Sequence, residues 1–305
     1  MDMNVSVGGL QLKNPVMTAS GTFGNGLEFA PYGDLSRLGG ICVKGLSLKP
    51  REGNPMPRIA ETPCGMLNAI GIQNPGVEYF VRSILPSLKR QDVGVVANLY
   101  ASDADEFGEL AGVLAAEDGI HALEVNVSCP NVKEGGAAFG QDPTQITRVT
   151  EAVKKQAGNT PVMVKLSPNV TDIVKCARAA VEGGADSLSL INTLLGMAVD
   201  ARNRRPRIAN VVAGLSGPAV KPVALRCVHQ VCRAVDVPVV GLGGIASAED
   251  ALEFILVGAH AVQVGTSNFM RPNFAFSLAD EMEALLLEMG VESLEEYRGS
   301  LILPL

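Results

Sequence analysis

The sequence lacks several patterns that assign a chain to a membrane or to nucleic acid. The N-terminus has no basic segment followed by an apolar one, so no signal peptide is indicated. The longest uncharged stretch, 254–270, contains His260, Gln263 and Asn268, and does not predict a membrane span. A net charge of −7 argues against nucleic acid as the main partner. We therefore expect a cytoplasmic protein that binds neither a membrane nor nucleic acid.

The six cysteines also lack a paired spacing. They stand at positions 42, 64, 129, 176, 227 and 232 without a CxxC run, which indicates neither a disulfide framework nor an iron–sulfur cluster. Cys227, His229 and Cys232 are expected on one helix, but at about 100° per residue only the last two share a face. Two ligands do not make a zinc site. We expect free thiols and no metal ion.

A repeating alternation of strands and helices is present instead. Short β-branched runs bounded by turn residues predict strands near 15–19, 41–46, 93–99, 122–128, 161–166, 187–192, 237–242 and 261–265. Helix-period segments lie at 76–90, 103–117, 143–157, 170–183, 218–235 and 247–258, with one or two further helices between 272 and 298. Eight such parallel units close a barrel. The predicted fold is an α/β TIM (β/α)8 barrel, a single domain over 1–305.

The carboxyl ends of the predicted strands carry polar residues or glycines. In chain order they are Ser20, Lys44, Asn98, Asn126 with Cys129, Lys165, Asn192, Gly243 with Gly244, and Gly265 with Thr266. In a parallel barrel all eight ends open at one mouth, where such enzymes hold their active sites. One asparagine at a strand end is more often a turn former, but eight coincident ends are hard to explain by turns. Connections 47–75 and 193–217 are too long for ordinary turns, so we expect insertions that cover this mouth.

Residues 124–131, EVNVSCPN, are the most informative stretch. Period-2 alternation places Glu124 and Asn126 on one face and the two valines on the other, and Pro130 stops the strand. Cys129 therefore stands where a strand becomes a loop, a usual place for a reactive side chain. A buried structural thiol is the default interpretation of a single cysteine, but these neighbours favour a reactive one.

Two strand ends predict a phosphate site. GLGGIAS (241–247) leaves a strand through glycines, and a helix then begins at Ser247 with Asp250 at its third position in a near capping box. GTS (265–267) follows the next strand, and backbone N–H groups after strands seven and eight bind a phosphate in many barrels. GLGG is not the GxGxxG dinucleotide fingerprint, so a mononucleotide fits better.

Lys44 and Lys165 are expected to share the mouth with that phosphate. Buried lysines need a partner or lose their charge, and a redox ring that becomes anionic on reduction is such a partner. A Schiff-base lysine of a carbonyl lyase, centred on Lys165, is equally compatible with a barrel. Composition does not decide between the two.

Together these motifs resemble the dihydroorotate dehydrogenases, and specifically the catalytic subunit of the class 1B, NAD-linked type. The resemblance extends over essentially the whole chain. It is carried by NPVMTASGTFG (14–24), VKG (43–45), MLNAIGIQNPG (66–76), NVSCPNVKEGG (126–136), VKLSPN (164–169), INT (191–193), GLSGPAVKP (214–222), GLGGI (241–245) and QVGT (263–266). It implies a barrel with one FMN per chain that oxidises (S)-dihydroorotate to orotate in the de novo pyrimidine pathway to UMP.

The resemblance also implies roles for individual residues. The FMN-binding set is Ser20, Lys44, Gly45, Asn98, Asn126, Lys165, Ile191, Gly217, Gly243, Gly244, Gly265 and Thr266. The set that holds dihydroorotate or orotate is Lys44, Asn68, Ile70, Gly71, Ile72, Asn126, Asn131, Asn192 and Thr193. Cys129 matches the catalytic base, where the membrane-bound class 2 relatives use serine. Lys44, near both rings, would favour their anionic forms.

The chemistry of these residues agrees with that activity. Removing hydrogen from the C5–C6 bond needs a base for the C5 proton and an acceptor for the C6 hydride. A Cys129 thiolate can accept the proton while flavin accepts the hydride. Asparagine side chains offer both donors and acceptors, which suits a planar substrate with alternating amide groups.

The electron acceptor stays undecided between two classes of relative. The NAD-linked type, clearest in NVKEGG after Cys129, implies a partner subunit that carries FAD and a 2Fe–2S cluster, bound to a homodimer core as a heterotetramer. The chain itself has no second nucleotide fingerprint. The class 1A type uses fumarate without such a partner. Four arginines in one loop more often form a solvated surface than a docking track; they are Arg202, Arg204, Arg205 and Arg207.

Overall fold

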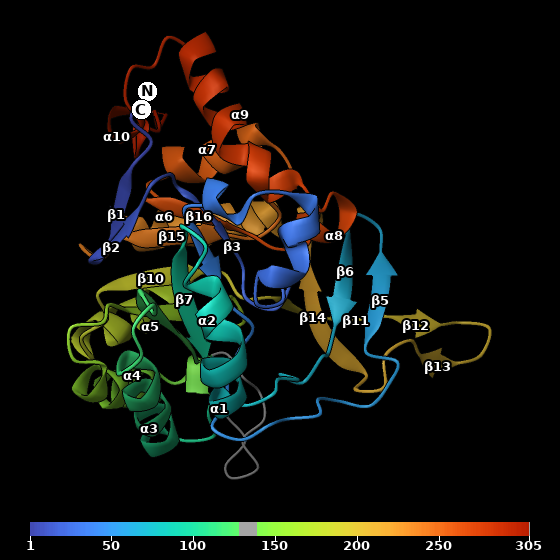
Figure 1. Ribbon diagram of the computed structural model, residues 1–305. Helices are drawn as coiled ribbons and strands as arrows, with labels where there is room; N and C mark the ends of the chain where they lie inside the picture. The colour runs from blue at the N-terminus through green and yellow to red at the C-terminus, as the bar shows by residue number, and fades with distance from the viewer. Residues whose placement is uncertain (128–138, 305) are drawn as a thin grey trace.

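Eight parallel strands close into a barrel at the centre of the computed structural model, which describes residues 1–127 and 139–304 (Figure 1). In chain order they are β3 (Val16–Thr18), β4 (Gly40–Cys42), β7 (Gly94–Leu99), β8 (Ala122–Asn126), β9 (Val162–Leu166), β10 (Ser187–Leu190), β15 (Val239–Leu242) and β16 (Ala261–Val264). Each pairs in parallel with the next, and β16 pairs with β3. The TIM barrel is therefore confirmed, with every strand end within four residues of the predicted one.

Helices surround the barrel, mostly where the sequence predicts them. They are α3 (Ala104–Ala115), α4 (Pro143–Ala157), α5 (Ile173–Glu182), α6 (Lys221–Cys232) and α7 (Ala248–Leu256). Asp103, Asp142 and Asp172 begin the first three, because each carboxylate accepts a backbone N–H bond of the first turn. The C-terminal helices α9 (Phe274–Glu288) and α10 (Leu294–Tyr297) are also present as predicted.

Several helical segments differ from the prediction. The expected helix 76–90 is divided into α1 (Val77–Tyr79), a π-helical turn η3 (Phe80–Ile84) and α2 (Leu85–Leu88). A short helix α8 (Ser267–Met270) follows β16, and 3-10 helices η1 (Leu27–Tyr32), η2 (Leu35–Arg37), η4 (Phe139–Gln141) and η5 (Pro218–Val220) lie in connections. These pieces are too short for helical periodicity to reveal them. No helix within residues 1–127 and 139–304 is both long and apolar enough to cross a membrane.

A hairpin that sequence analysis did not predict closes the N-terminal end of the barrel. Strands β1 (Val5–Val7) and β2 (Leu10–Leu12) pair antiparallel. Their buried side chains form one apolar cluster with inward-facing residues of the barrel strands: Val7, Leu10, Leu12, Met17, Cys42, Val96, Ala122, Met163, Val240 and Ala261. The turn at Gly8 fits tightly, since an added Cβ would lie 2.3 Å from the Asp186 carbonyl oxygen. This end is therefore packed shut.

The two long connections meet in a single antiparallel sheet. It consists of β5 (Ile59–Thr62), β6 (Gly65–Asn68), β11 (Leu194–Met197) and β14 (Val212–Ser216). The hydroxyl of Thr266, just past β16, donates to that of Ser216 over 2.8 Å, which places the sheet at the carboxyl edge of the barrel. A hairpin of β12 (Val199–Asp200) and β13 (Arg205–Pro206) extends from it (Figure 1). The four arginines of the predicted basic cluster lie on this hairpin and beside it, and all four are exposed.

Candidate active site

Most of the predicted site residues lie at the carboxyl ends of the barrel strands. Asn98 and Lys165 are the second-last residues of β7 and β9, and Asn126 is the last residue of β8. Ser20, Lys44, Ile191, Gly243 and Gly265 each follow their strand by one or two residues. Because parallel strands all end at one rim, these residues share the mouth. Cys129 and Asn131 lie outside the described residues.

The glycine-rich ends form one side of the mouth. Gly244 adopts a φ of +85°, and a Cβ there would lie 2.8 Å from the Lys221 nitrogen and 2.9 Å from the Gly217 carbonyl. Strands β15 and β16 are direct neighbours, so Gly243 and Gly244 lie beside Gly265 and Thr266. Ser247 caps α7 as predicted, accepting a hydrogen bond from the Asp250 N–H over 3.1 Å. These segments and the start of α7 together offer backbone groups suited to an anion.

The amide residues form the other side of the mouth. The Asn192 amide nitrogen donates to the Asn126 side-chain oxygen over 3.2 Å. Thr193 donates its backbone N–H to Asn192 over 2.8 Å and packs against Gly214, which pairs with Asn68 across the inserted sheet. The amide and threonine side chains on this side thus come from the ends of two barrel strands and from both insertions.

The loop that carries Ile70, Gly71 and Ile72 also reaches this region. The Ile70 carbonyl accepts a backbone hydrogen bond from Asn54 over 2.9 Å, and Gly71 turns there with a φ of +76°. A Cβ built on Gly45 would approach the Ile72 side chain at 3.4 Å and the Asn98 side-chain oxygen at 2.9 Å. The glycine at position 45 therefore lets the loop approach the end of β7.

Lys44 is a partly buried cation for which no ion pair occurs among residues 1–127 and 139–304. Burial, and then the nearby Arg58 guanidinium, lower the pKa of its ammonium group. Its Nζ lies 3.4 Å from the position of a Cβ on Gly21. A desolvated lysine flanked by another cation fits an anionic ligand.

Lys165 and Asn98 share a buried acid that sequence analysis did not assign to the site. Glu124 lies 3.7 Å from the Lys165 Nζ and accepts a 2.6 Å hydrogen bond from the Asn98 amide. Ser189 and Gln263, also unassigned, donate to the same carboxylate. Polar residues at inward positions of otherwise apolar strands were the available signal.

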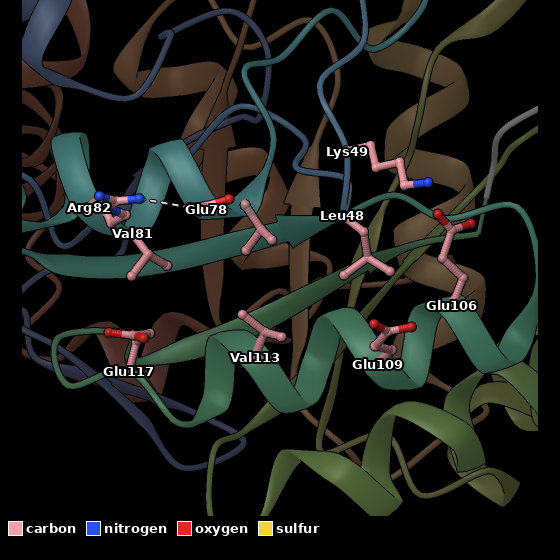
Figure 2. A pocket seen from close by; sticks show the side chains of 10 residues that line it. Leu48, Lys49, Glu78, Val81, Arg82, Glu106, Glu109, Val113 and Glu117 are labelled. Atoms are coloured by element: carbon pink, nitrogen blue, oxygen red, sulfur yellow. Dashed lines mark hydrogen bonds and ion pairs between the residues drawn. The ribbon is translucent and has the colours of Figure 1, made fainter.

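A groove on the described surface lies elsewhere (Figure 2). It has a volume of about 860 Å³ and runs between the α1–η3 segment and α3. Val81 and Val113 face each other across it, while Glu78, Glu106 and Glu109 stand along its rim. None of the predicted site residues lines it, so its size does not locate the reaction.

Comparisons with known proteins agree on one family. The sequence model described as dihydroorotate dehydrogenase matches residues 2–286. A protein of Maridesulfovibrio salexigens named dihydroorotate dehydrogenase B (NAD(+)), catalytic subunit, is 70% identical over 304 residues, covering 100% of both chains. Proteins of the same name from Solidesulfovibrio magneticus and Geotalea uraniireducens are 69% and 55% identical, each covering 99% of this chain and 98% of their own.

Proposed function

This chain belongs to the dihydroorotate dehydrogenase family, and we propose that it is a catalytic subunit that oxidises (S)-dihydroorotate to orotate in pyrimidine biosynthesis. The observation that carries the proposal is the mouth itself, where one buried and one partly buried lysine, a glycine-rich rim and several amide side chains lie at the same end of the barrel. The relatives named as catalytic subunits of the NAD-linked enzyme share this chain over its full length. The catalytic unit is the single domain 1–305.

The residues of the mouth fit FMN. An added Cβ on Gly265 would lie 3.5 Å from Ala19, an ordinary van der Waals contact, whereas one on Gly243 or Gly244 would lie only 2.8 Å from its nearest neighbour, so the chain follows this path at the rim only with glycine there. We assign the phosphate to Gly243, Gly244, Gly265 and Thr266, with Gly217 and Ile191 beside it. The ring would contact Ser20, Lys44, Gly45, Asn98, Asn126 and Lys165. FMN, one per chain, supplies the acceptor for the hydride that leaves C6 of the substrate.

The amide side holds the substrate. The side chains of Asn68, Asn126, Asn131 and Asn192, with Thr193, offer donors and acceptors to the pyrimidine edge. The loop Ile70, Gly71 and Ile72 would cover it and exclude water. Lys44 supplies a positive charge to the substrate carboxylate, and its lack of an acidic partner among the described residues supports that assignment. A ring held flat at this rim is positioned for transfer over a short distance.

Cys129 is the proposed base. It follows β8 by three residues, and the strand ends at the mouth. Its thiolate would take the C5 proton while the C6 hydride leaves. Lys44 favours such anionic forms because it brings a positive charge that no acid among the described residues pairs with.

The Schiff-base alternative finds less support. A lysine that condenses with a carbonyl must be present as a neutral amine. Lys165 instead lies 3.7 Å from the Glu124 carboxylate, in an ion pair buried inside the barrel. Borohydride trapping of a carbonyl substrate on Lys165 would support this alternative.

We propose NAD as the final acceptor, reached through a partner subunit that carries FAD and a 2Fe–2S cluster. The name of the relatives, a catalytic subunit, supports a partner. A homodimer of this chain with two such partners gives a heterotetramer located in the cytoplasm. The runner-up is a fumarate-using enzyme without a partner.

One experiment tests these assignments together. The purified chain should bind FMN and be reduced by dihydroorotate, with NAD turnover only after the flavin and iron–sulfur partner is added. A colourless chain that neither binds added FMN nor forms orotate contradicts the proposed activity. Turnover with fumarate alone supports the runner-up.

A further inference from the structure

Lys221 is a cation at the start of α6 to which the proposed reaction gives no part. It belongs to the motif GLSGPAVKP (214–222), but it is not among the residues assigned to FMN or to the substrate. Its backbone lies against the glycine-rich rim, because a Cβ built on Gly244 would lie 2.8 Å from the Lys221 nitrogen. Its side chain is only 24% exposed. A lysine so close to a proposed phosphate site requires an explanation.

The Lys221 side chain joins α6 to α7 through an ion pair with two acids. Its Nζ donates to Asp250 Oδ1 and lies 2.8 Å from Glu253 Oε2. Burial by itself lowers the pKa of Lys221, but the two carboxylates outweigh it, so this pKa lies above its ordinary value. Burial by itself raises the pKa of Asp250, but Lys221 and a backbone N–H outweigh it, so that pKa lies below its ordinary value. Both groups are therefore charged at neutral pH.

Asp250 also holds the loop that leaves β15. Its Oδ2 accepts a hydrogen bond from the Ala246 N–H over 2.9 Å. On the other side of the loop, Arg271 donates to the Ala246 carbonyl and the Ser267 hydroxyl donates to the Ile245 carbonyl. The loop is thus fixed between α7 and the segment that follows β16, and Asp250 connects it to Lys221.

The rim held in this way offers backbone donors to an anion. The N–H groups of Gly244, Gly265 and Thr266 donate no hydrogen bond within residues 1–127 and 139–304. A phosphate monoester carries a charge of about −1.5 to −2 at neutral pH. Asp250 in the first turn of α7 and Glu253 one turn later bring negative charge to the same region, so without a cation both acids would oppose the binding of a phosphate.

We propose that Lys221 is a positioning residue of the FMN phosphate site, which acts on the phosphate through Asp250 and Glu253 rather than by contact. This inference rests on the proposed function. The ammonium group compensates the two carboxylates beside the glycine-rich rim. Through Asp250 it also keeps in place the loop whose N–H groups face the phosphate.

The substitution Lys221→Met removes the charge and keeps most of the length of the side chain. Both acids are then uncompensated, so the affinity for FMN should fall by about tenfold. Riboflavin has the same ring system without the phosphate, so its affinity should stay native. Titration of the full chain, freed of flavin, with each compound measures both dissociation constants by quenching of flavin fluorescence. A purely structural contribution would weaken both compounds alike.

Two further variants separate compensation of the acids from direct contact with the phosphate. The double variant Lys221→Met, Asp250→Asn removes one repelling charge, and the asparagine oxygen still accepts the Ala246 N–H bond. It should bind FMN more tightly than Lys221→Met alone. Lys221→Arg retains the positive charge beside both acids, so its ratio of FMN to riboflavin affinity should be native.

Lys154→Met is the matched control at the opposite end of the barrel. Lys154 pairs with Asp186 over 2.8 Å, with both side chains 30% exposed, and Asp186 also accepts a backbone hydrogen bond from Val162 at the start of β9. This ion pair has the same construction but lies far from the rim. Its loss should leave the ratio of the two flavin affinities native.

Each outcome supports the inference or overturns it. A native affinity ratio in Lys221→Met overturns it. A loss of FMN affinity that Asp250→Asn does not relieve also overturns it, because the lysine would then contact the phosphate itself. Should Lys221→Met fail to fold, Glu253→Gln decides, since it removes one negative charge and keeps an acceptor for Lys221. FMN should then bind more tightly relative to riboflavin, and an unchanged ratio overturns the inference. A native chain that binds neither flavin overturns the proposed function, and the inference with it.

Discussion

The two ends of the barrel consist of the same strands but carry opposite chemistry. At the N-terminal end, Met17, Val96, Met163 and Val240 pack against the β1–β2 hairpin as an apolar plug. At the carboxyl end, β7, β8 and β9 carry the inward amide and charged side chains of Asn98, Glu124 and Lys165, and β15 ends in glycines. In such barrels the first end contributes stability and the second the reaction.

Along these strands the inward-facing side chains change from apolar to polar within two residues. Inward positions repeat with period two, and the strand advances about 6.6 Å per pair of residues. Thus Val96 is followed inward by Asn98, Ala122 by Glu124, and Met163 by Lys165. Substitutions at the two ends should therefore separate activity from stability, although they lie close together along each strand.

The largest expected effect is at the mouth, for Cys129→Ser. A serine hydroxyl is a much poorer base near neutral pH, so the rate of orotate formation should fall by about 10²- to 10⁴-fold. The residual rate should rise with pH. Stopped-flow reduction of FMN by dihydroorotate across the pH range measures both. A rate within a few-fold of the native one would contradict the assignment of the base, and an unchanged melting temperature is the control for folding.

The opposite end is tested by Leu10→Ala in the hairpin. Leu10 is 2% exposed within the apolar plug, and the loss of such a side chain costs about 2–5 kcal/mol of unfolding free energy. Urea unfolding measures this loss, while the rate of FMN reduction should remain native. Leu287→Ala on α9 is the control, since that leucine is 58% exposed and its loss should cost under about 0.5 kcal/mol. A strong loss of activity in Leu10→Ala with intact folding would contradict the assignment of stability to the N-terminal end of the barrel and of the reaction to the carboxyl end.

A smaller effect is expected for Arg58→Gln in the first insertion. Burial and then Arg58 lower the pKa of Lys44. If the reaction needs charged Lys44, activity is lost as the pH rises through that lowered pKa. Removing Arg58 should move this alkaline loss to higher pH, by only part of the shift because burial, the larger cause, remains. The pH profile of FMN reduction measures it, with Arg202→Gln on the exposed hairpin as control. A shift to lower pH would be inconsistent with this electrostatic account.

The smallest effect is expected at the amino end of β16, for His260→Asn. Burial, and then Arg298, lower the pKa of His260 to about 4. Its neutral Nδ1 accepts a hydrogen bond from the Val239 N–H over 3.4 Å, and an asparagine oxygen can replace that acceptor.

The sign of this pH effect follows from proton binding. The unfolded state takes up a proton near the ordinary pKa of 6.5, which the folded state does not, so stability is lost as the pH falls from 6.5 toward 4. The variant should lose less stability over this window than the native protein, and should match it at alkaline pH. Urea midpoints at several pH values measure the difference. An identical pH dependence in both proteins would show that His260 does not contribute.

Local patterns were sufficient to predict most of the fold. The predicted helix 143–157 coincides with α4, because Asp142 caps it, Pro143 suits its first turn and its apolar spacing is regular. The hairpin at Val5–Val7 and Leu10–Leu12 was missed, because three-residue strands carry no measurable periodicity. The two insertions were recognised by length, yet their pairing in one sheet joins residues far apart in the chain, such as Asn68 and Gly214.

Sequence alone determined the barrel, its polar rim and the family motifs, because strand period, turn residues and strand-end chemistry are local properties that short stretches of chain express by themselves. Only the tertiary structure decided that Glu124 accepts hydrogen bonds from residues of four other strands and pairs with Lys165 of a fifth. The physical reason is closure: residues as distant as Cys42 and Gln263 share one carboxylate only when β16 returns to β3 and completes the ring.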